Sequence, residues 1–561
     1  MIYSAIALIL SASALTACSS DDGVTGDPAR NWAGTTNAFT PTDEQGFGTY
    51  YMPAIGRVGD PMPFYDKKAG DFKVLYLQEF DNNMSHRFHP IWGVSTKDGA
   101  SYQSLGEVLP YGSNDYVQDA ALGTGCAYYD EANGLYYIYY TGHNGNCQYR
   151  EVVMRATSTD FKTWTKDELW ALNGPDYGYS ANDFRDPQIF MADDGLYRMV
   201  ISTYPKNGGD PQFAEFKSSD LKNWEHVGPF KMIWDRMLEC PDIFKMGDYW
   251  YLVYSQSFRA SWSRKVKYMF AKSWEALKDC FNNGPKWPAD GPLWREGNLD
   301  TRAFYAGKTA SNGTDRFIWG WTPYRSGADI HEKNINVGAG DGNEPNWSGA
   351  LVCHKLIQHK GGTLDGTMSM GAVPAMAAKY SKPQEVKVMA SNGYDLSNDG
   401  FTLSGDDAYV LYSRLGTCNH ISFKVTTDKN RDKFGVSFVR STDPDYYYTL
   451  VVNDEDENVR KVNFEQEGYR IVEEWSEEEQ KMVEKKVYGK GFIEGADGYG
   501  FYLPEKNEYN IDIYTDNSVL VMYINDIVCC THRIYGIQKN CWSINNYGGK
   551  ITISDLKISQ Q

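Results

Sequence analysis

Short runs of aromatic and β-branched residues recur along the first two thirds of the chain, separated by Gly and Asp turns. Their spacing is roughly 60 residues, which is typical of the blades of a β-propeller. The pattern therefore predicts an all-β fold that starts with a five-bladed β-propeller over residues 46–370. The five runs span residues 72–77, 135–140, 196–201, 249–254 and 316–321.

A second, weaker repeat follows the aromatic runs. Ser158–Trp164 reads STDFKTW and Ser218–Trp224 reads SSDLKNW, while Ser95–Asp98 keeps only part of the phrase. Each copy falls after an aromatic run, where the outer turn of a blade is expected.

Beyond residue 380 the pattern changes to alternating strands without the long period. Examples are residues 420–425, 447–452 and 519–524, each bounded by turn residues. Such spacing favours a β-sandwich, which we expect over residues 380–561. The Glu-rich stretch from Glu473 to Lys486 predicts a solvated hairpin or a short helix.

The first residues have the pattern of an export signal. Residues 2–15 form an apolar run that is too short to span a bilayer as a mature helix. It ends in Leu15-Thr16-Ala17-Cys18, which resembles a bacterial lipobox. The resemblance implies a lipoprotein signal peptide at 1–17, lipidation of Cys18 and a tether over 18–45. The acidic residues after Cys18 resemble a signal for the outer face of the outer membrane, so we expect a lipid-anchored protein at the cell surface.

Charge narrows the class of partner. The 561 residues carry a formal net charge of −18, which disfavours nucleic acid and anionic polymers as partners and leaves neutral small molecules or neutral polymers. The ten Cys and nine His match no zinc spacing, so we predict no metal and no cofactor. Cys126 and Cys147 flank one expected hairpin strand and are candidates for a disulfide.

An acidic residue precedes a Phe by four or five positions in four phrases, each placed just before an aromatic run. In a propeller the innermost strand of each blade lines the central axis, so equivalent positions converge on one end of it. We therefore expect the four acids to share one pocket, where like charges raise one another's pKa. Such a pocket can hold one carboxylate ionised and another protonated, as glycoside hydrolysis requires. The four acids are Asp60, Asp186, Glu239 and Asp300.

These phrases resemble glycoside hydrolase family 32, the β-fructosidases. The most specific pieces are Arg185-Asp186-Pro187 and Glu239-Cys240-Pro241-Asp242. Further pieces that follow the family are residues 90–95, Asp300 with 304–306, 317–321, 347–349 and, in the sandwich, 513–516 and 523–525.

The resemblance implies roles for the matching residues. Asp60 corresponds to the nucleophile, Glu239 to the general acid/base and Asp186 to the stabiliser of the transition state. Arg185 would orient Asp186, and Cys240 would tune the neighbouring acid. The implied outcome is retention at the anomeric carbon, with the two reacting carboxyl groups about 5–5.5 Å apart.

The substrate-binding candidates are Arg185, Trp92, Gln78 and Asp300. His86 and His89 lie on an expected loop near the pocket. The sequence departs from the family around the nucleophile, with Val58-Gly59 before Asp60 and Met62 after Pro61. Leu77 stands where the family has Gln, with Gln78 one place later, and the Ser-rich phrase of the second blade is reduced to Gly123-Thr124-Gly125.

Two alternatives remain open beside a β-fructosidase that acts on neutral fructans or sucrose-like sugars. One is a five-bladed hydrolase of the arabinanase or xylosidase type, which would invert and hold its acids about 6.5–9.5 Å apart. The other is a surface lipoprotein that binds glycans on Tyr and Trp platforms without cleaving them.

Overall fold

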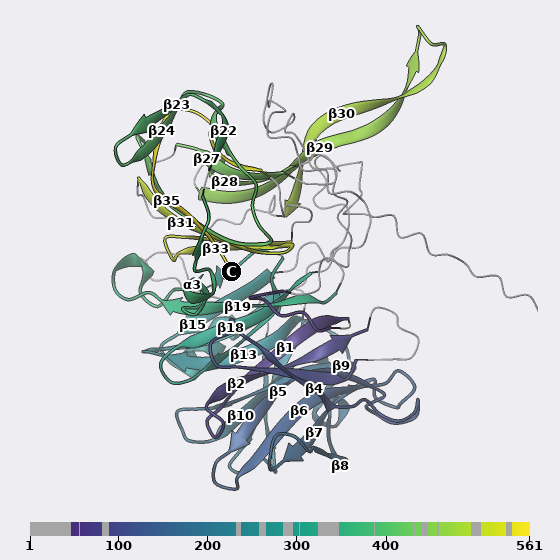
Figure 1. The fold of residues 1–561 in the computed structure, drawn as a ribbon. Coiled ribbons are helices and arrows are strands. Elements are labelled where there is room, and N and C mark those ends of the chain that lie inside the picture. The colour runs from purple at the N-terminus through teal and green to yellow at the C-terminus, as the bar shows by residue number, and fades with distance from the viewer. Residues whose placement is uncertain are drawn as a thin grey trace, which may run out of the picture.

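The computed structural model shows a chain built almost entirely of β-strands (Figure 1). Among the described residues, the α-helices are α1 (Trp274–Asn283) and α3 (Met376–Lys379), and none of them is long and apolar enough to cross a membrane. The structure describes residues 47–54, 56–80, 89–231, 237–256, 265–283, 296–301, 303–323, 347–385, 387–429, 432–439, 447–456, 459–494, 507–533 and 541–561. The expected signal peptide, Cys18, the whole tether and His86 lie outside them.

We call residues 57–371 the first half of the structure and residues 382–560 the second half. The first half contains three separate four-stranded antiparallel sheets. In each sheet the strands pair in the order of the sequence. The first consists of β5 (Ala121–Asp130), β6 (Leu135–His143), β7 (Glu151–Ser158) and β8 (Thr165–Asn173). The second consists of β9 (Tyr179–Met191), β10 (Tyr197–Pro205), β11 (Gln212–Ser218) and β12 (Glu225–Lys231). The third consists of β13 (Leu238–Met246), β14 (Tyr249–Gln256), β15 (Lys265–Ala271) and β16 (Glu296–Asn298).

An eight-stranded sheet joins the beginning of this half to its end, in the order β17-β18-β19-β1-β2-β3-β4 with β20 on β19. The early strands are β1 (Arg57–Asp66), β2 (Asp71–Glu79), β3 (Ile91–Thr96) and β4 (Gln103–Leu109). The late strands are β17 (Tyr305–Ser311), β18 (Arg316–Pro323), β19 (Gly349–Gln358) and β20 (Met368–Gly371). The pair Val58–Gly349 connects the two groups.

The first strand of each four-strand group contacts the first strand of the next. β1 contacts β5, β5 contacts β9, β9 contacts β13, β13 contacts β17, and β17 returns to β1, which closes a ring. The second strands β2, β6, β10, β14 and β18 coincide with the five aromatic runs, so their prediction as strands is confirmed. Their side chains are buried on both faces because each sheet packs between two others.

Each ring strand carries a β-bulge, which lies near the N-terminal end of β1, β5, β13 and β17 and in the middle of β9. In β9 the pairing passes from Arg185–Ser202 to Gln188–Val200, so one extra residue is inserted. The same extra residue appears in β13 between Glu239 and Asp242. Bulges bend a strand and redirect its side chains. The other three bulges lie at 58–61 in β1, 123–125 in β5 and 305–308 in β17.

The second repeat forms the turn between the third and fourth strands of a sheet, as expected. The hydroxyl of Ser158 accepts from the amide of Asp160, and Asp160 Oδ1 accepts from the amides of residues 162 and 163. Ser218 and Asp220 make the same bonds in the next sheet.

Two packed sheets form the second half (Figure 1, upper part). One has the order β23-β24-β35-β26-β31-β32-β33 with β21 on β35, and the other β22-β25-β34-β27-β28-β29-β30. Their facing side chains form one hydrophobic core. The strands are β21 (Lys382–Pro383), β22 (Val388–Asn392), β23 (Tyr394–Ser397), β24 (Gly400–Ser404), β25 (Ala408–Tyr412), β26 (Cys418–Thr427), β27 (Phe434–Val439), β28 (Tyr447–Asp456), β29 (Val459–Ser476), β30 (Lys481–Glu494), β31 (Glu508–Asp516), β32 (Val519–Ile524), β33 (Val528–Arg533), β34 (Trp542–Asn546) and β35 (Lys550–Gln560).

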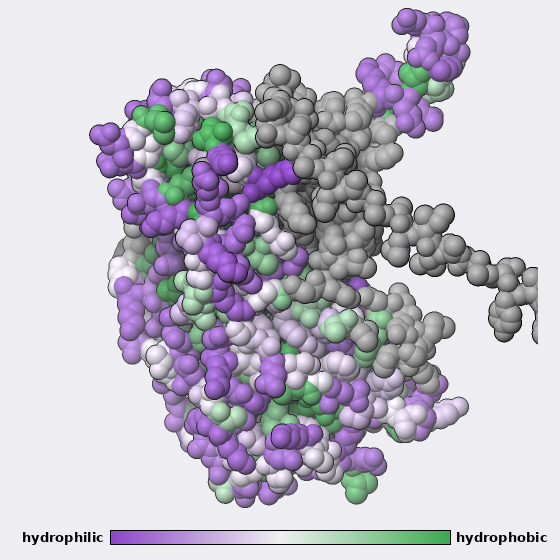
Figure 2. Space-filling model, viewed as in Figure 1, coloured by the Kyte–Doolittle hydropathy of each residue, from purple (hydrophilic) through white to green (hydrophobic). Residues whose placement is uncertain are grey.

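The Glu-rich stretch forms the tip of the β29–β30 hairpin, which projects from its sheet (Figure 1). The hairpin alternative is therefore confirmed, and the charged side chains of residues 473–485 are exposed. Hydrophilic residues dominate the surface in view, with hydrophobic residues in small groups (Figure 2). Cys126 and Cys147 are both free thiols, so the disulfide considered for them is wrong. Cys126 is buried, whereas Cys147 is partly exposed on the turn after β6.

Candidate active site

A cavity of about 590 Å³ opens at the bulged ends of the ring strands. The bulges place polar side chains of all five ring strands on its wall. We call it the axial pocket. Its lining residues are Asp60, Leu77, His89, Ala121, Leu122, Gly123, Thr124, Thr141, His143, Glu151, Arg185, Asp186, Glu239, Cys240, Tyr305 and Trp347. Three of the four acids expected to converge therefore do so.

Asp60 is held by one donor on each carboxylate oxygen. The Thr124 hydroxyl donates to Oδ2 at 2.7 Å, and the indole N–H of Trp321 donates to Oδ1 at 2.8 Å. Trp321 lies on β18 and is fully buried, so its ring cannot turn away. Asp60 itself is half-buried and borders the pocket. Two fixed donors leave the carboxylate one orientation toward the cavity.

Asp186 occupies the bulge of β9 with φ of 60°, a left-handed conformation that a non-glycine residue seldom adopts. Its amide donates to the Thr141 hydroxyl at 3.1 Å, and its Oδ2 accepts from the amide of Cys240 at 2.8 Å. The side chain is only 4% exposed. Burial raises the pKa of Asp186 to about 7, against the opposing charge of Arg185, and Glu239 and Asp60 add to the rise.

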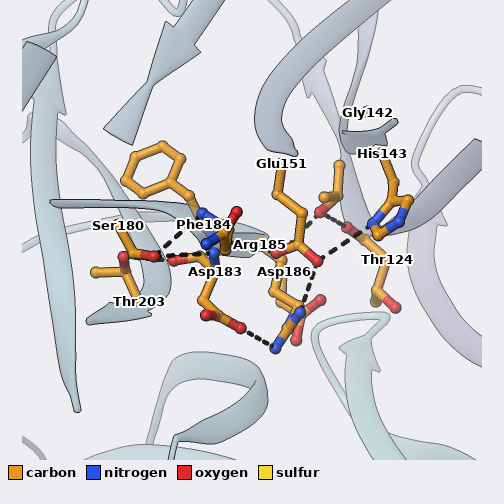
Figure 3. A network of polar contacts seen from close by, with 12 residues as sticks. Thr124, Gly142, His143, Glu151, Ser180, Asp183, Phe184, Arg185, Asp186 and Thr203 are labelled. Atoms are coloured by element: carbon orange, nitrogen blue, oxygen red, sulfur yellow. Dashed lines mark hydrogen bonds and ion pairs between the residues drawn. The ribbon is translucent and has the colours of Figure 1, made fainter. Parts of the chain in front are cut away.

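Arg185 is fixed from behind by two carboxylates (Figure 3). Its Nη1 donates to Glu151 Oε1 at 2.6 Å and its Nη2 to Asp183 Oδ1 at 2.9 Å. Burial disfavours the charged guanidinium, yet these acids together with Glu239 and Asp186 hold its pKa above the ordinary value. Glu151 also accepts a hydrogen bond from the amide of Phe184, so one buried carboxylate positions the part of β9 that precedes Asp186.

Glu239 precedes the bulge of β13 and accepts a hydrogen bond from the Tyr305 hydroxyl at 2.8 Å. Tyr305 precedes the equivalent bulge of β17 and is 5% exposed. The residue after Glu239, Cys240, has φ of 50° and turns its amide toward Asp186. Burial, and then the charges of Asp186 and Asp60, raise the pKa of the Cys240 thiol, so it stays protonated. The two acids are thus connected by one peptide N–H.

Trp347 and His89 form a part of the wall. The sequence placed His89 near the pocket but did not single out Trp347 as a site residue. Their rings lie 4.5 Å apart at 34°, and His89 also contacts Glu79 Oε2 at 2.8 Å. A Cβ on Gly59 would come within 2.4 Å of the Trp347 ring. The indole therefore fills the space that a side chain before Asp60 would need, which gives the departure at Gly59 a physical reason.

Two of the substrate-binding candidates lie beside the axial pocket without lining it. Gln78 is fully buried and donates to the carbonyl of Glu79, and Leu77 lines the pocket instead. Trp92 is half-buried on β3, where it packs edge-on against Phe80. Only Arg185 of the four candidates is among the lining residues.

Asp300 does not join the other acids, so its placement in the pocket is wrong. Its Oδ1 accepts from the amides of Thr301 and Thr531 at 2.7 Å, and the Thr531 hydroxyl donates to Oδ2. Thr531 lies on β33 of the sandwich, so Asp300 belongs to the contact between the two halves. The reason is register: the bulge of β17 begins after Tyr305, five residues beyond Asp300, and Tyr305 takes the position that Glu239 has in β13.

Asp300, His354 and Cys529 are the candidates for a metal site among the described residues, with ligand atoms within 4.8 Å of one another. All three side chains are buried. The Cys529 thiol donates to Asp300, and His354 shares a hydrogen bond with the Tyr523 hydroxyl at 2.8 Å. Burial lowers the pKa of His354 to about 3, so this ring is neutral. The cluster is a hydrogen-bonded network that connects β19 and the segment between β16 and β17 to the sandwich.

The residues missed by sequence reasoning are Glu151, Thr124, Tyr305, His143 and Trp347. Glu151, His143 and Trp347 belong to none of the acid phrases, so the repeat gave no signal for them. Tyr305 and Thr124 lie within the segments 304–306 and 123–125, which were compared with the family. Aligning these segments on the bulges could have identified both residues.

Comparison with known proteins shows to which family the chain belongs. The model of the glycosyl hydrolases family 32 N-terminal domain matches residues 51–364, and that of the "GH32, BT1760-like, C-terminal domain" matches 366–558. A sucrose-6-phosphate hydrolase of Zymomonas mobilis is 26% identical over 240 residues, which cover 38% of this chain and 43% of the relative. One from Escherichia coli is 28% identical over 245 residues, covering 39% and 46%. The matches thus span less than half the length of these relatives.

Solved structures show the same fold over nearly the whole chain. The sucrose-6-phosphate hydrolase of Lactobacillus gasseri aligns with a TM-score of 0.64 at 15% identity, covering 93% of this chain and 94% of the other. The fructan 1-exohydrolase IIa of Cichorium intybus in complex with 1-kestose aligns with a TM-score of 0.61 at 15% identity, covering 92% and 98%. The fold is therefore a β-propeller followed by a β-sandwich. Because the family's N-terminal model covers more than half of the chain and its C-terminal model most of the rest, this protein belongs to glycosyl hydrolase family 32.

Proposed function

We propose that this protein is a retaining β-fructofuranosidase that cleaves neutral fructans or sucrose-like sugars in the axial pocket. The observation that carries the proposal is that Asp60, Asp186 and Glu239, from three different ring strands, line one cavity. Family membership supports the same activity, and so do its relatives, which include a sucrose-6-phosphate hydrolase and a fructan 1-exohydrolase.

The two reacting carboxyl groups have separate tasks. Asp60 attacks the anomeric carbon of the fructosyl unit while Glu239 gives its proton to the departing glycosidic oxygen. The product is a covalent fructosyl–Asp60 ester. Glu239, now ionised, then takes a proton from water, whose oxygen attacks the same carbon and releases Asp60. Two displacements restore the original configuration.

The neighbours prepare these groups for their tasks. Thr124 and Trp321 hold Asp60 toward the cavity, and Tyr305 orients Glu239. Asp186 accepts hydrogen bonds from ring hydroxyls, which strengthen as the ring becomes oxocarbenium-like. Arg185 keeps a positive charge beside Asp186 and thereby favours its ionised form.

Charge supports a neutral substrate over a phosphorylated one. The carboxylates on the pocket wall are Asp60, Glu151, Asp186 and Glu239, and the guanidinium of Arg185, already paired with Glu151 and Asp183, is the cation opposite them. A phosphate dianion would be repelled by this wall.

The test is hydrolysis of sucrose, inulin, levan, arabinan and xylan by the chain from residue 19 onward, at about pH 6, with the released sugars separated by chromatography. We expect fructose or fructo-oligosaccharides from the wild type and none from Glu239→Gln. Asp395→Asn, which changes an exposed carboxylate of the sandwich, is the matched control and should leave activity unchanged. Arabinose or xylose instead of fructose, or binding without release, would contradict the proposal.

For the fold we propose five blades, formed by β1–β4, β5–β8, β9–β12, β13–β16 and β17–β20. The closed ring of five first strands supports this count. We further propose domain limits of 46–370 and 380–561. The strands of the two groups of sheets, which span 57–371 and 382–560, support this proposal.

We also propose that residues 1–17 are removed, that Cys18 is lipidated and that the protein is displayed on the outer membrane. The lipobox-like Leu15-Thr16-Ala17-Cys18 supports this proposal. Radiolabelled palmitate should label the wild type and not Cys18→Ser, and protease added to intact cells should degrade the wild type. Label in Cys18→Ser, or protection from protease, would contradict it.

A further inference from the structure

Every ring strand carries a bulge that borders the axial pocket and, further along, a second position that also repeats from strand to strand. The proposed chemistry uses only the bulge. Each ring strand has a residue in or beside its bulge, and the position four residues further along the strand follows a pattern. In four strands this position is aromatic, and in the fifth it is Ala310. Four residues of strand span about 13 Å, so these side chains gather at the other end of the ring. The aromatic residues are Phe64, Tyr128, Phe190 and Phe244.

A second cavity of about 600 Å³ lies at that end, similar in volume to the axial pocket. All four aromatic residues line it, and Ala310 leaves open the space that a fifth ring would fill. Tyr65, Tyr128 and Tyr129 are half-buried there, so their rings are within reach of a ligand. The charged residues that line it are Lys67, Glu131, Asp193, Asp242, Lys245 and Arg316.

The charges on the wall of the second cavity balance. Lys67 pairs with Glu131 at 2.5 Å, and Lys245 pairs with Asp193 at 2.8 Å. The remaining charged groups are Arg316 and the buried Asp242, which are of opposite sign. A wall of this kind gives no net attraction to an ion, whereas the axial pocket is strongly acidic.

The floor of the second cavity carries hydrogen-bonding groups set among the aromatic rings. Arg316 stacks 4.0 Å above the Phe244 ring and gives one hydrogen bond, from Nη1 to the Thr309 hydroxyl at 2.7 Å. No carboxylate of the described residues pairs with it within 4.0 Å. Asp242 accepts from Thr309 and from the Gln188 side chain. Burial raises the pKa of Asp242 and lowers that of Arg316 to about 10.

We infer that the second cavity binds a neutral oligosaccharide, as a site separate from the catalytic one. Aromatic faces bind the apolar face of a sugar ring, and a few polar groups among them satisfy its hydroxyls. The balanced charge excludes ionic ligands as the preferred class. That the sugar is a fructan rests on the proposed function. A site at the far end of the ring would hold another segment of a polymer and raise the local concentration of substrate.

The test measures binding stoichiometry with the fructan tetrasaccharide nystose, using Glu239→Gln so that the ligand survives. Equilibrium dialysis should give two sites per chain. Adding Ala310→Phe, which fills the open position of the aromatic ring, should reduce this to one. Arg316→Gln removes a donor without adding volume and serves where Ala310→Phe does not fold, as judged by its melting temperature. Asp395→Asn is the matched control and should keep both sites.

Kinetics give a second reading in chains with an intact active site. Ala310→Phe should leave kcat/KM for sucrose unchanged and lower kcat/KM for long inulin several-fold. Binding that neither Ala310→Phe nor Arg316→Gln reduces would overturn the inference. Failure of the proposed function would appear in a different experiment, the hydrolysis test, in which the wild type would release no fructose. In that case the same dialysis is carried out with arabinan and xylan oligosaccharides. Binding of these sugars that neither Ala310→Phe nor Arg316→Gln reduces would again overturn the inference.

Discussion

At the scale of the residue, the axial pocket combines acidic groups with neighbours that set their protonation. Asp186 is nearly inaccessible to water and has its pKa raised to about 7, first by burial and then by the nearby acids. Arg185 opposes this rise, and Glu151 and Asp183 hold it in place. The arrangement makes the ionisation of one carboxylate depend on a single cation.

The pH profile should report this dependence. Asp186 is protonated below its pKa and ionised above it, so an activity that needs its carboxylate rises with pH through about 7. Arg185→Gln removes the cation that lowers this pKa, and we expect the acidic limb of kcat/KM to move upward by about one pH unit. Arg185→Lys keeps the charge and should move the limb less, although a lysine cannot reproduce the simultaneous contacts of the guanidinium with Glu151 and Asp183. An unchanged limb in Arg185→Gln would refute this role.

At the scale of the element, the bulges determine which side chains reach the axis. Asp186, Cys240 and Ala306 all have positive φ at equivalent places in β9, β13 and β17. A non-glycine residue in this conformation costs about 1–2 kcal/mol, so the surrounding sheets must enforce it. As a result, Glu239 and Tyr305, which precede the bulges of β13 and β17, face one another.

Ala306 allows this strain to be tested. Ala306→Val places a β-branched side chain in a left-handed conformation, so we expect a melting temperature several degrees lower, and a lower kcat because Tyr305 would shift away from Glu239. Ala306→Gly should keep both values or raise the melting temperature slightly.

Ala350→Val is the control for overpacking, because Ala350 is equally buried on β19 and is not among the residues with positive φ. If Ala350→Val lowers kcat as much as Ala306→Val does, the strain argument is wrong.

At the scale of the whole molecule, Asp300 connects the propeller to the sandwich through Thr531. Burial raises its pKa to about 7 against several donors. A carboxyl group with a raised pKa in the folded state gives stability that is present below pH 4 and is lost as the pH rises through 7. We therefore expect the contact between the two halves to be pH-sensitive, with a change in stability of up to about 4 kcal/mol.

Asp300→Asn should remove this dependence. Between pH 4 and 7.5 we expect the melting temperature of the wild type to fall relative to that of Asp300→Asn, as measured by calorimetry at several pH values. Asp395→Asn, in which an exposed carboxylate is replaced, should track the wild type throughout. A constant difference between the wild type and Asp300→Asn would show that Asp300 keeps an ordinary pKa.

Local patterns in the sequence were sufficient for the elements and for the trio of acids. The aromatic runs identified the second strand of every sheet, because a strand buried on both faces must be hydrophobic along its whole length. The repeated phrases identified Asp60, Asp186 and Glu239, since a repeat that closes into a ring brings equivalent positions together. Resemblance to family 32 supplied their roles, which remain to be tested.

Only the tertiary structure decided which other residues join them. Asp300 fits the repeat of acids but lies five residues before its bulge, and no local pattern reports the register between two strands. Trp347, Glu151 and His89 reach the pocket from segments outside the phrases, because ring closure joins residues that are far apart in the chain. Local hydrophobicity encodes burial and strand type, whereas the composition of a pocket depends on long-range packing and on single-residue shifts in pairing.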